Sequence, residues 1–188
     1  MSGMTYKERA SGFTMMELLM VVTIAGILAA IGVPSFRYVT ASNRIATELN
    51  ALVGDLQFAR SEAAKSGLPV TVCASTDGAT CANSSTWNTG WIVFQAVGAN
   101  VTVLRVQKTF TATGSSDTLV ASNAAFQSVV FNREGFAATG VASVVNVALH
   151  SAPVNNQWTR CLAVTPVGAL TVEKYGDQKY GTGTPACS

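Results

Sequence analysis

The sequence predicts an α+β protein, in which a long N-terminal α-helix is packed against a C-terminal antiparallel β-rich domain. Two features predict this fold. An uncharged apolar stretch from Leu18 to Phe36 leads into a helical pattern that ends at Gly67. Beyond it, β-branched runs alternate with Gly, Ser, Asn and Thr clusters, which is typical of short strands joined by turns. The length of 188 residues suits one domain and an anchoring segment.

The apolar stretch has the length of a membrane span. As a helix, residues 18–36 would extend over about 28 Å, close to the hydrocarbon thickness of a bilayer. Glu17 is the one acid among residues 13–36, and a short polar segment, residues 1–12, precedes them. Two other interpretations stay open: a conventional signal peptide cleaved near residues 30–32, which leaves Glu17 unexplained, and an unprocessed membrane anchor.

The helical pattern continues beyond Pro34. Gly67 and Pro69 then provide a stop, because glycine tolerates the left-handed cap and proline cannot continue a helix. We therefore expect residues 37–67 to form an amphipathic half of the helix, with a globular domain packed along one side. Its apolar stripe recurs at spacings of three and four residues: Ile45, Leu49, Leu52, Leu56, Ala59 and Ala63.

Residues 68–188 are expected to form the β-rich head. A Ser/Thr/Asn-rich loop is predicted over residues 77–90. Large rings at alternate strand positions favour burial, so we expect Trp87, Trp91 and Phe94 to lie in the core. The predicted strands are Val70–Ala74, Trp91–Gln95, Val101–Thr111, Val129–Asn132, Val144–His150, Cys161–Thr165 and Ala169–Lys174.

Four cysteines lie downstream of the apolar stretch: Cys73, Cys81, Cys161 and Cys187. They contain no C-x-x-C pair, so we expect no metal site. An even number beyond a membrane segment indicates two disulfides formed outside the cytoplasm. Of the three possible connectivities, Cys73–Cys81 and Cys161–Cys187 are favoured because they close the shortest loops.

Charge and composition exclude several functions. The net charge is +2, so no strong basic field indicates a nucleic-acid partner. The sequence contains no Ser/His/Asp set, no acid pair and no glycine-rich phosphate loop, and its single histidine, His150, is expected at a strand end. We therefore expect no catalytic residues, no cofactor and no enzymatic activity.

The segment Gly12-Phe13-Thr14-Met15-Met16-Glu17-Leu18-Leu19 resembles the class III leader junction of type IV pilins and type II secretion pseudopilins. The resemblance implies that a prepilin peptidase removes residues 1–12 after Gly12 and methylates Phe13. It also implies that residues 13–36 form the transmembrane and filament-core half of the helix. Glu17 would then meet the new amine of Phe13 on a neighbouring subunit during assembly. An acid that reaches the membrane surface is the alternative role for Glu17.

Three further segments resemble the GspH/FimT family of minor pilins and pseudopilins: the helix end at residues 55–63, Trp87 with Gly90-Trp91-Ile92-Val93-Phe94, and Phe131-Asn132-Arg133-Glu134-Gly135. The resemblance covers most of the chain. It implies a head of β-strands packed on the long helix, in agreement with the strands predicted above.

The resemblance leaves three functions open. The favoured one is a minor pilin of the FimU kind, which primes type IV pilus assembly and sits at or near the filament tip. A pseudopilin of the type II secretion pseudopilus tip is the second. The third is DNA capture for natural transformation, but the G-R-x-R motif of FimT-like DNA binders is replaced here by Gly168-Ala169-Leu170-Thr171, so DNA is an unlikely partner.

The implied partners are the prepilin peptidase and the other minor and major pilins of the filament. The implied location is the bacterial inner membrane before assembly, as a single-pass protein with its C-terminal domain in the periplasm. After assembly, the protein would be part of the type IV pilus on the cell surface.

Overall fold

The computed structural model describes residues 12–108, 117–139, 143–152, 154–177 and 187. The chain divides into two compact units, one ending at Thr40 and the other beginning at Ala41, and each is described by itself below. The helix α1 (Met15–Ser66) contributes residues to both units. Gly26 and Pro34, both of which can weaken a helix, lie within it.

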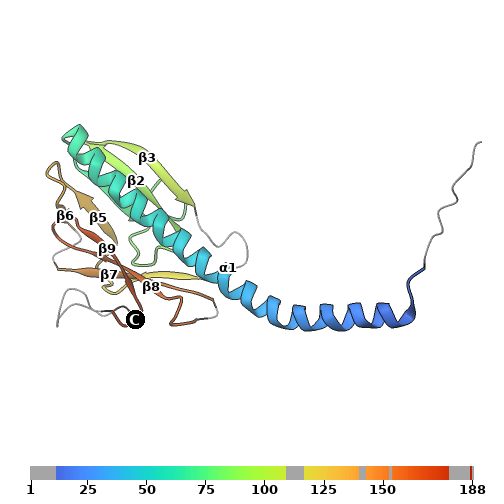
Figure 1. Cartoon of the computed structure of the whole chain (residues 1–188). Helices are drawn as coiled ribbons and strands as arrows, with labels where there is room; N and C mark the ends of the chain where they lie inside the picture. The colour runs from blue at the N-terminus through green and yellow to red at the C-terminus, as the bar shows by residue number, and fades with distance from the viewer. Residues whose placement is uncertain (1–11, 109–116, 140–142, 153, 178–186, 188) are drawn as a thin grey trace, which may run out of the picture. The chain divides into compact units, whose positions relative to one another are not determined.

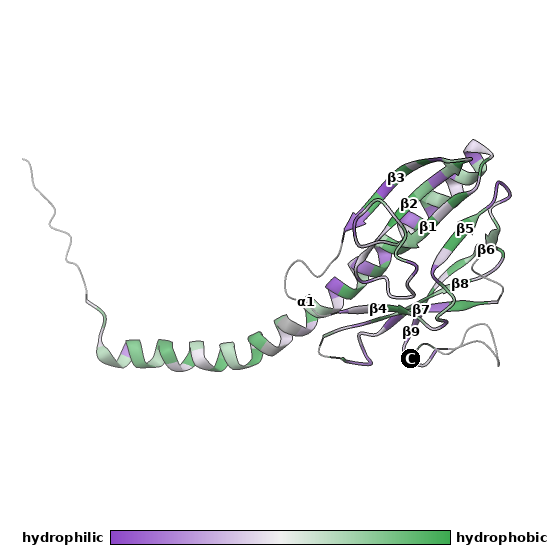
Figure 2. Ribbon diagram, turned by 180° about the vertical axis from the view of Figure 1, so that it is seen from behind, coloured by the Kyte–Doolittle hydropathy of each residue, from purple (hydrophilic) through white to green (hydrophobic). Residues whose placement is uncertain are grey.

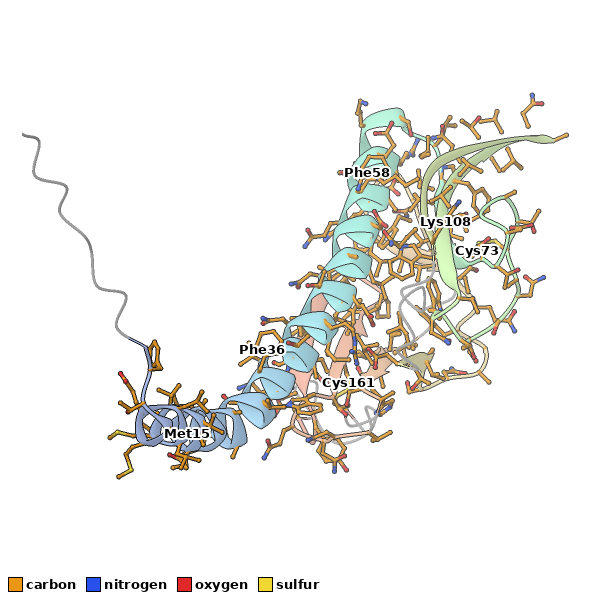
Figure 3. All side chains as sticks on the ribbon, turned by 90° about the vertical axis from the view of Figure 1, so that its right-hand side faces the viewer. Met15, Phe36, Phe58, Cys73, Lys108 and Cys161 are labelled. Carbon is orange, nitrogen blue, oxygen red and sulfur yellow. A yellow bond between two sulfur atoms is a disulfide. The ribbon has the colours of Figure 1, made fainter. Side chains whose placement is uncertain are left out.

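In the first unit, α1 exposes apolar side chains on all sides. Thr14 begins the helix: its hydroxyl accepts a hydrogen bond from the Glu17 backbone N–H at 3.2 Å, and its carbonyl accepts one from Leu18 at 3.1 Å. The most apolar 18-residue window of α1 has a mean hydropathy of 2.3, and none of it is buried. Figure 2 shows this part of the helix in mostly hydrophobic colours, and Figure 3 shows the side chains near Met15 projecting around it.

In the second unit, the end of α1 buries one face. All six residues of the predicted stripe are at most 2% exposed: Ile45, Leu49, Leu52, Leu56, Ala59 and Ala63. The helix ends as the sequence predicted. Gly67 has a φ of +72° and donates its N–H to the Ala63 carbonyl at 3.0 Å.

Five strands form the first sheet, in the order β3-β2-β1-β5-β6. Each neighbouring pair is antiparallel. The end of α1 lies along this sheet (Figure 1). The strands are β1 (Val70–Ala74), β2 (Gly90–Val97), β3 (Asn100–Lys108), β5 (Ser128–Phe131) and β6 (Ala137–Thr139).

Four strands form the second sheet, in the order β4-β7-β8-β9, and its pairs are also antiparallel. A bridge between Thr86 and Val120 connects the long loop after β1 to the edge strand of this sheet. The strands are β4 (Thr118–Ala121), β7 (Val145–His150), β8 (Arg160–Val164) and β9 (Leu170–Lys174).

One hydrophobic core joins the helix to both sheets. Its buried members include Leu52 of α1, Val72 of β1 and Leu162 of β8. Trp87 and Trp91 are buried in it, and Trp87 stacks on Phe126 with ring centroids 5.7 Å apart. Because each element contributes only one apolar face, the helix and the two sheets depend on one another for burial.

The structure confirms the predicted α+β class and places a strand at each predicted run; residues 109–111 of the run Val101–Thr111 lie outside the described residues. Two strands were not predicted, β4 and β6, because four and three residues are too few for a periodic signal. The expectation for Phe94 was wrong. Phe94 is half-buried and lies on the sheet face opposite the core, beside Ile92. Side chains alternate along a strand, and Trp91, three residues before Phe94, faces the core.

Candidate functional site

The predicted processing junction lies directly before the first turn of α1. Gly12 and Phe13 are exposed, and the Phe13 side chain is 75% accessible. Glu17 occupies the third position after the Thr14 cap, where a carboxylate is favoured by the partial positive charge of a helix N-terminus. Among the described residues, no ion pair includes Glu17.

The exposed surface of this part of α1 is larger than a soluble helix would carry. Leu18 and Val22 lie on one side of the helix and Ile27 and Ile31 on the opposite side, and each is more than half exposed. Apolar surface of this extent requires lipid or other apolar helices around it. By length and composition, α1 is therefore able to cross a membrane.

In the second unit, Arg60 connects α1 to two turns. Its Nη1 donates to the Gly168 carbonyl at 3.0 Å, and its side chain lies against Gly135. The two glycines have φ angles of +75° and +80°, which favour glycine. A Cβ on Gly168 would lie 2.3 Å from the Gly135 carbonyl oxygen. The turns after β5 and β8 can therefore approach this closely only because position 168 is glycine, whereas a Cβ on Gly135 would meet the Arg60 side chain.

This contact explains one of the sequence motifs. In Phe131-Asn132-Arg133-Glu134-Gly135, Phe131 is buried in the core and the Asn132 side chain accepts hydrogen bonds from the Glu134 and Phe136 N–H groups. The Asn132 side chain thus shapes the turn that brings Gly135 to Gly168. Sequence reasoning identified this motif but did not identify Arg60 or Gly168 as its partners.

A buried carboxylate on α1 holds the edge of the first sheet. Asp55 accepts a hydrogen bond from the Trp91 indole at 2.8 Å and one from Arg105 at 3.0 Å. The Arg105 guanidinium also lies 3.8 Å from the centre of the Phe58 ring, a cation–π contact. Two of the sequence motifs, the helix end and the G-W strand, therefore meet through Asp55 and Trp91.

Two further acids, Asp117 and Glu48, lie near Arg44 of α1. Asp117 is buried, and it accepts hydrogen bonds from Arg44 and from the Ala152 N–H. Glu48, one turn along α1 from Arg44, is only 4% exposed. Burial, reinforced by the nearby Asp117 charge and opposed by Arg44, raises the pKa of Glu48 to about 7.

The sequence analysis did not identify Asp55 and Glu48 as buried carboxylates, although a signal was present. Asp55 and Glu48 each lie three residues after a member of the apolar stripe, Leu52 and Ile45, and so share its face. An acid inside such a stripe indicates a carboxylate that is buried on folding.

The disulfides follow the expected pairing. Cys73 is bonded to Cys81 and Cys161 to Cys187, and the Cα atoms of each pair lie 5.6 and 5.5 Å apart. The first bond holds the loop after β1 beside the outer face of the first sheet. The second holds Cys187 against β8. His150 is the last residue of β7, and no cluster of three metal-ligating side chains occurs among the described residues.

Most cations of the described ranges have partners within the chain, so they do not form a free basic face. The paired side chains are Arg44 with Asp117, Lys65 with Glu62, Arg105 with Asp55 and Arg133 with Glu134. Arg60 and Arg160 donate to backbone carbonyls. At the Gly168 turn, which stands in place of the G-R-x-R motif considered above, the Arg60 guanidinium donates to the carbonyls of Val167 and Gly168.

Comparison with known proteins agrees with this geometry. The model of the family described as "Type II transport protein GspH" matches residues 48–168, more than half of the chain. No curated protein matches the sequence.

Two crystal structures of the type IV minor pilin FimU from Pseudomonas aeruginosa (strain PAO1) are similar to this chain, both at 22% identity. One has a TM-score of 0.55 over 73% of this chain and 92% of FimU, and the other has 0.50 over 69% and 90%. FimU and this chain share the fold of one N-terminal helix packed on antiparallel sheets. The chain therefore belongs to the GspH family of type IV pilin-like proteins.

Proposed function

We propose that the protein is a minor pilin, a structural subunit that helps to prime assembly of a type IV pilus and sits at or near its tip. The observation that supports this most is the first half of α1. It is apolar and exposed on every side, and it bears one acid, Glu17, beside the predicted N-terminus. The head has the fold of FimU, which is a type IV minor pilin.

The proposed mechanism begins with removal of residues 1–12 by a prepilin peptidase. This creates a positive amine at Phe13, one turn from Glu17 in sequence. In the membrane, a carboxylate without a partner costs on the order of 2.5–3.5 kcal/mol. Pairing of Glu17 with the amine of a neighbouring subunit would remove this penalty and set the axial register between the two helices.

In this proposal the head stays in the periplasm while the helix is in the inner membrane, and reaches the cell surface with the filament. Its partners are the other minor pilins and the major pilin. The head would present side chains to those neighbours while its own core, helix and disulfides keep its shape.

A pseudopilin of a type II secretion system is the second candidate, because the matching family model is named for type II transport. Deletion of the gene distinguishes the two. Loss of surface pili with normal protein secretion supports the pilus function, whereas loss of secretion with normal piliation supports the pseudopilin.

Processing is tested by mass spectrometry of the mature protein. We expect an N-terminus at Phe13 that carries one methyl group. Gly12→Val should accumulate uncut precursor, because a branched side chain occupies the space the peptidase requires. Met15→Leu is the matched control and should be cut normally. An N-terminus near Gly32 would instead indicate a secretory signal and refute the proposal.

A further inference from the structure

The first sheet has an exposed edge strand, β3. Among the described strands, β3 pairs only with β2, so the opposite side of its backbone is open. Its burial is low along almost its entire length, and Val101, Val103 and Val106 are between 37% and 58% exposed. An open edge of nine residues with exposed valines is a ready template for another strand.

The loop closed by the Cys73–Cys81 disulfide divides the face beside β3 into two hollows. Gly78 packs onto Val106 so closely that a Cβ would lie 2.9 Å from Val106 Cγ1. One hollow, of about 250 Å³, is apolar and lined by Ala79, Thr80, Cys81, Ile92, Phe94 and Val101. It is large enough for one large apolar side chain.

The other hollow, of about 230 Å³, is polar and lies at the end of β3, where it is lined by Asp77, Gln107 and Lys108 among others. Lys108 is labelled in Figure 3. Hydrogen bonds from the Thr80 hydroxyl and from the Thr80 and Ala79 N–H groups hold the pKa of Asp77 well below its usual range and occupy its oxygens. No ion pair among the described residues includes Lys108.

The charge of this region favours one kind of occupant. Residues 90–108 contain Arg105 and Lys108 and no acid. Asp77, the acid in the polar hollow, has both oxygens engaged by donors of its own loop, so they are not offered to an incoming strand. Arg105 is engaged by Asp55, so Lys108 is the cation of β3 that lacks a carboxylate partner in the described ranges. A second copy of β3 would bring two more cations to the same ribbon without an acid, which disfavours self-pairing.

We propose that β3 and its two hollows bind an extended segment of another protein subunit, which adds a strand to the sheet. The segment carries a large apolar side chain for the hollow at Val101 and a carboxylate for Lys108. Val101 and Lys108 are seven residues apart on β3, but the pairing irregularity between them adds one residue, and their partners on β2, Ala96 and Gly90, are six apart. Side chains six positions apart on a regular added strand share a face and lie about 20 Å apart, so a segment of about seven residues spans the two hollows. Main-chain hydrogen bonds supply affinity, and the two hollows supply specificity. The proposal rests on the proposed function only for the source of the segment, a neighbouring filament subunit.

The test uses the processed full-length chain in detergent and a fluorescent probe peptide, Phe-Thr-Val-Thr-Val-Thr-Glu, whose Phe and Glu share one face of an extended strand. Its reversed sequence is tested as well, because a strand edge accepts either direction. Fluorescence anisotropy should detect saturable binding of one of them. N-methylation of alternate peptide nitrogens should weaken binding by at least about tenfold, because it removes the donors of the added strand.

A charge exchange tests the proposed register. Lys108→Glu should weaken binding by about two- to fivefold, as expected for an exposed ion pair, and a probe with Lys in place of its Glu should recover the loss. Lys174→Glu, an exposed cation on the edge strand of the other sheet, is the matched control and should bind as the unaltered chain does. Cys73→Ser with Cys81→Ser should abolish the preference for Phe over Ala in the probe, because the loop forms one wall of the apolar hollow.

Four results would overturn the proposal. They are absence of binding up to about millimolar probe, equal binding of the N-methylated probe, no recovery in the charge exchange, and a disulfide-linked homodimer of Thr102→Cys. None of these measurements depends on piliation. Normal probe binding in a protein whose deletion leaves pili intact would therefore refute the proposed function and leave this site standing.

Discussion

Glu48 makes the stability of the head depend on pH in a direction that can be worked out from the structure. It lies in the apolar stripe of α1 and is 4% exposed, and Arg44, which is one turn away, is already held by Asp117. Its pKa is raised from 4.5 to about 7 by burial and by the Asp117 charge. The folded state therefore binds a proton that the unfolded chain has released between these two pH values.

The sign follows from this difference. A carboxyl group with a raised pKa in the folded protein lowers stability as pH increases from about 4.5 to about 7, and has no further effect above that range. The full shift corresponds to about 3.4 kcal/mol at about 1.36 kcal/mol per pH unit. Hydration and local relaxation reduce the effect, so we expect Glu48→Gln to stabilise the head by about 1–3 kcal/mol at pH 8.

The assay is thermal unfolding of the detergent-solubilised mature chain, followed by tryptophan fluorescence, because Trp87, Trp91 and Trp158 all lie in the second unit. A gain of 1 kcal/mol raises Tm by about 2–4 °C in a domain of this size. Glu48→Gln should have a higher Tm than the unaltered chain at pH 8 and nearly the same Tm at about pH 4.5.

Glu62→Gln is the control, since Glu62 is on the same helix and pairs only with the exposed Lys65. This substitution should leave the pH dependence unchanged. If Glu48→Gln retained the pH dependence of the unaltered chain, or lowered Tm at pH 8, Glu48 would not be the buried acid with the raised pKa described above.

Four further outcomes are expected. Glu17→Ala should insert in the membrane and fold normally yet reduce filament assembly, so normal piliation in this variant would exclude Glu17 as an assembly contact. Gly168→Ala should lower the free energy of unfolding by about 2–4 kcal/mol, whereas Gly176→Ala, also at positive φ but with open space around it, should lower it by about 1 kcal/mol; equal losses would contradict the contact between the two turns. Non-reducing peptide mapping should recover both disulfides, and four free thiols would be the contrary result. The mature chain should not shift double-stranded DNA at physiological salt, and a shift at low micromolar protein would make DNA capture the leading function.

The sequence alone determined the elements and their order, because these depend on local patterns. The uncharged stretch before Phe36 predicted the exposed apolar helix. The stripe that begins at Ile45 predicted the buried face of α1 residue by residue, and Gly67 predicted its end. The two disulfides follow the pairing that the shortest loops favoured. The roles of Gly12, Phe13 and Glu17 were inferred from a resemblance and remain predictions.

Only the tertiary structure decided which distant residues meet. Arg44 and Asp117 are 73 residues apart in sequence, and Arg60 and Gly168 are 108 apart, so no periodicity connects them. The same holds for the loop of Gly78, which lies on Val106 and turns the edge of a sheet into two hollows. A helix or strand is specified by spacing along the chain, whereas a contact between elements also depends on how their faces pack, which a single sequence does not encode in any local pattern.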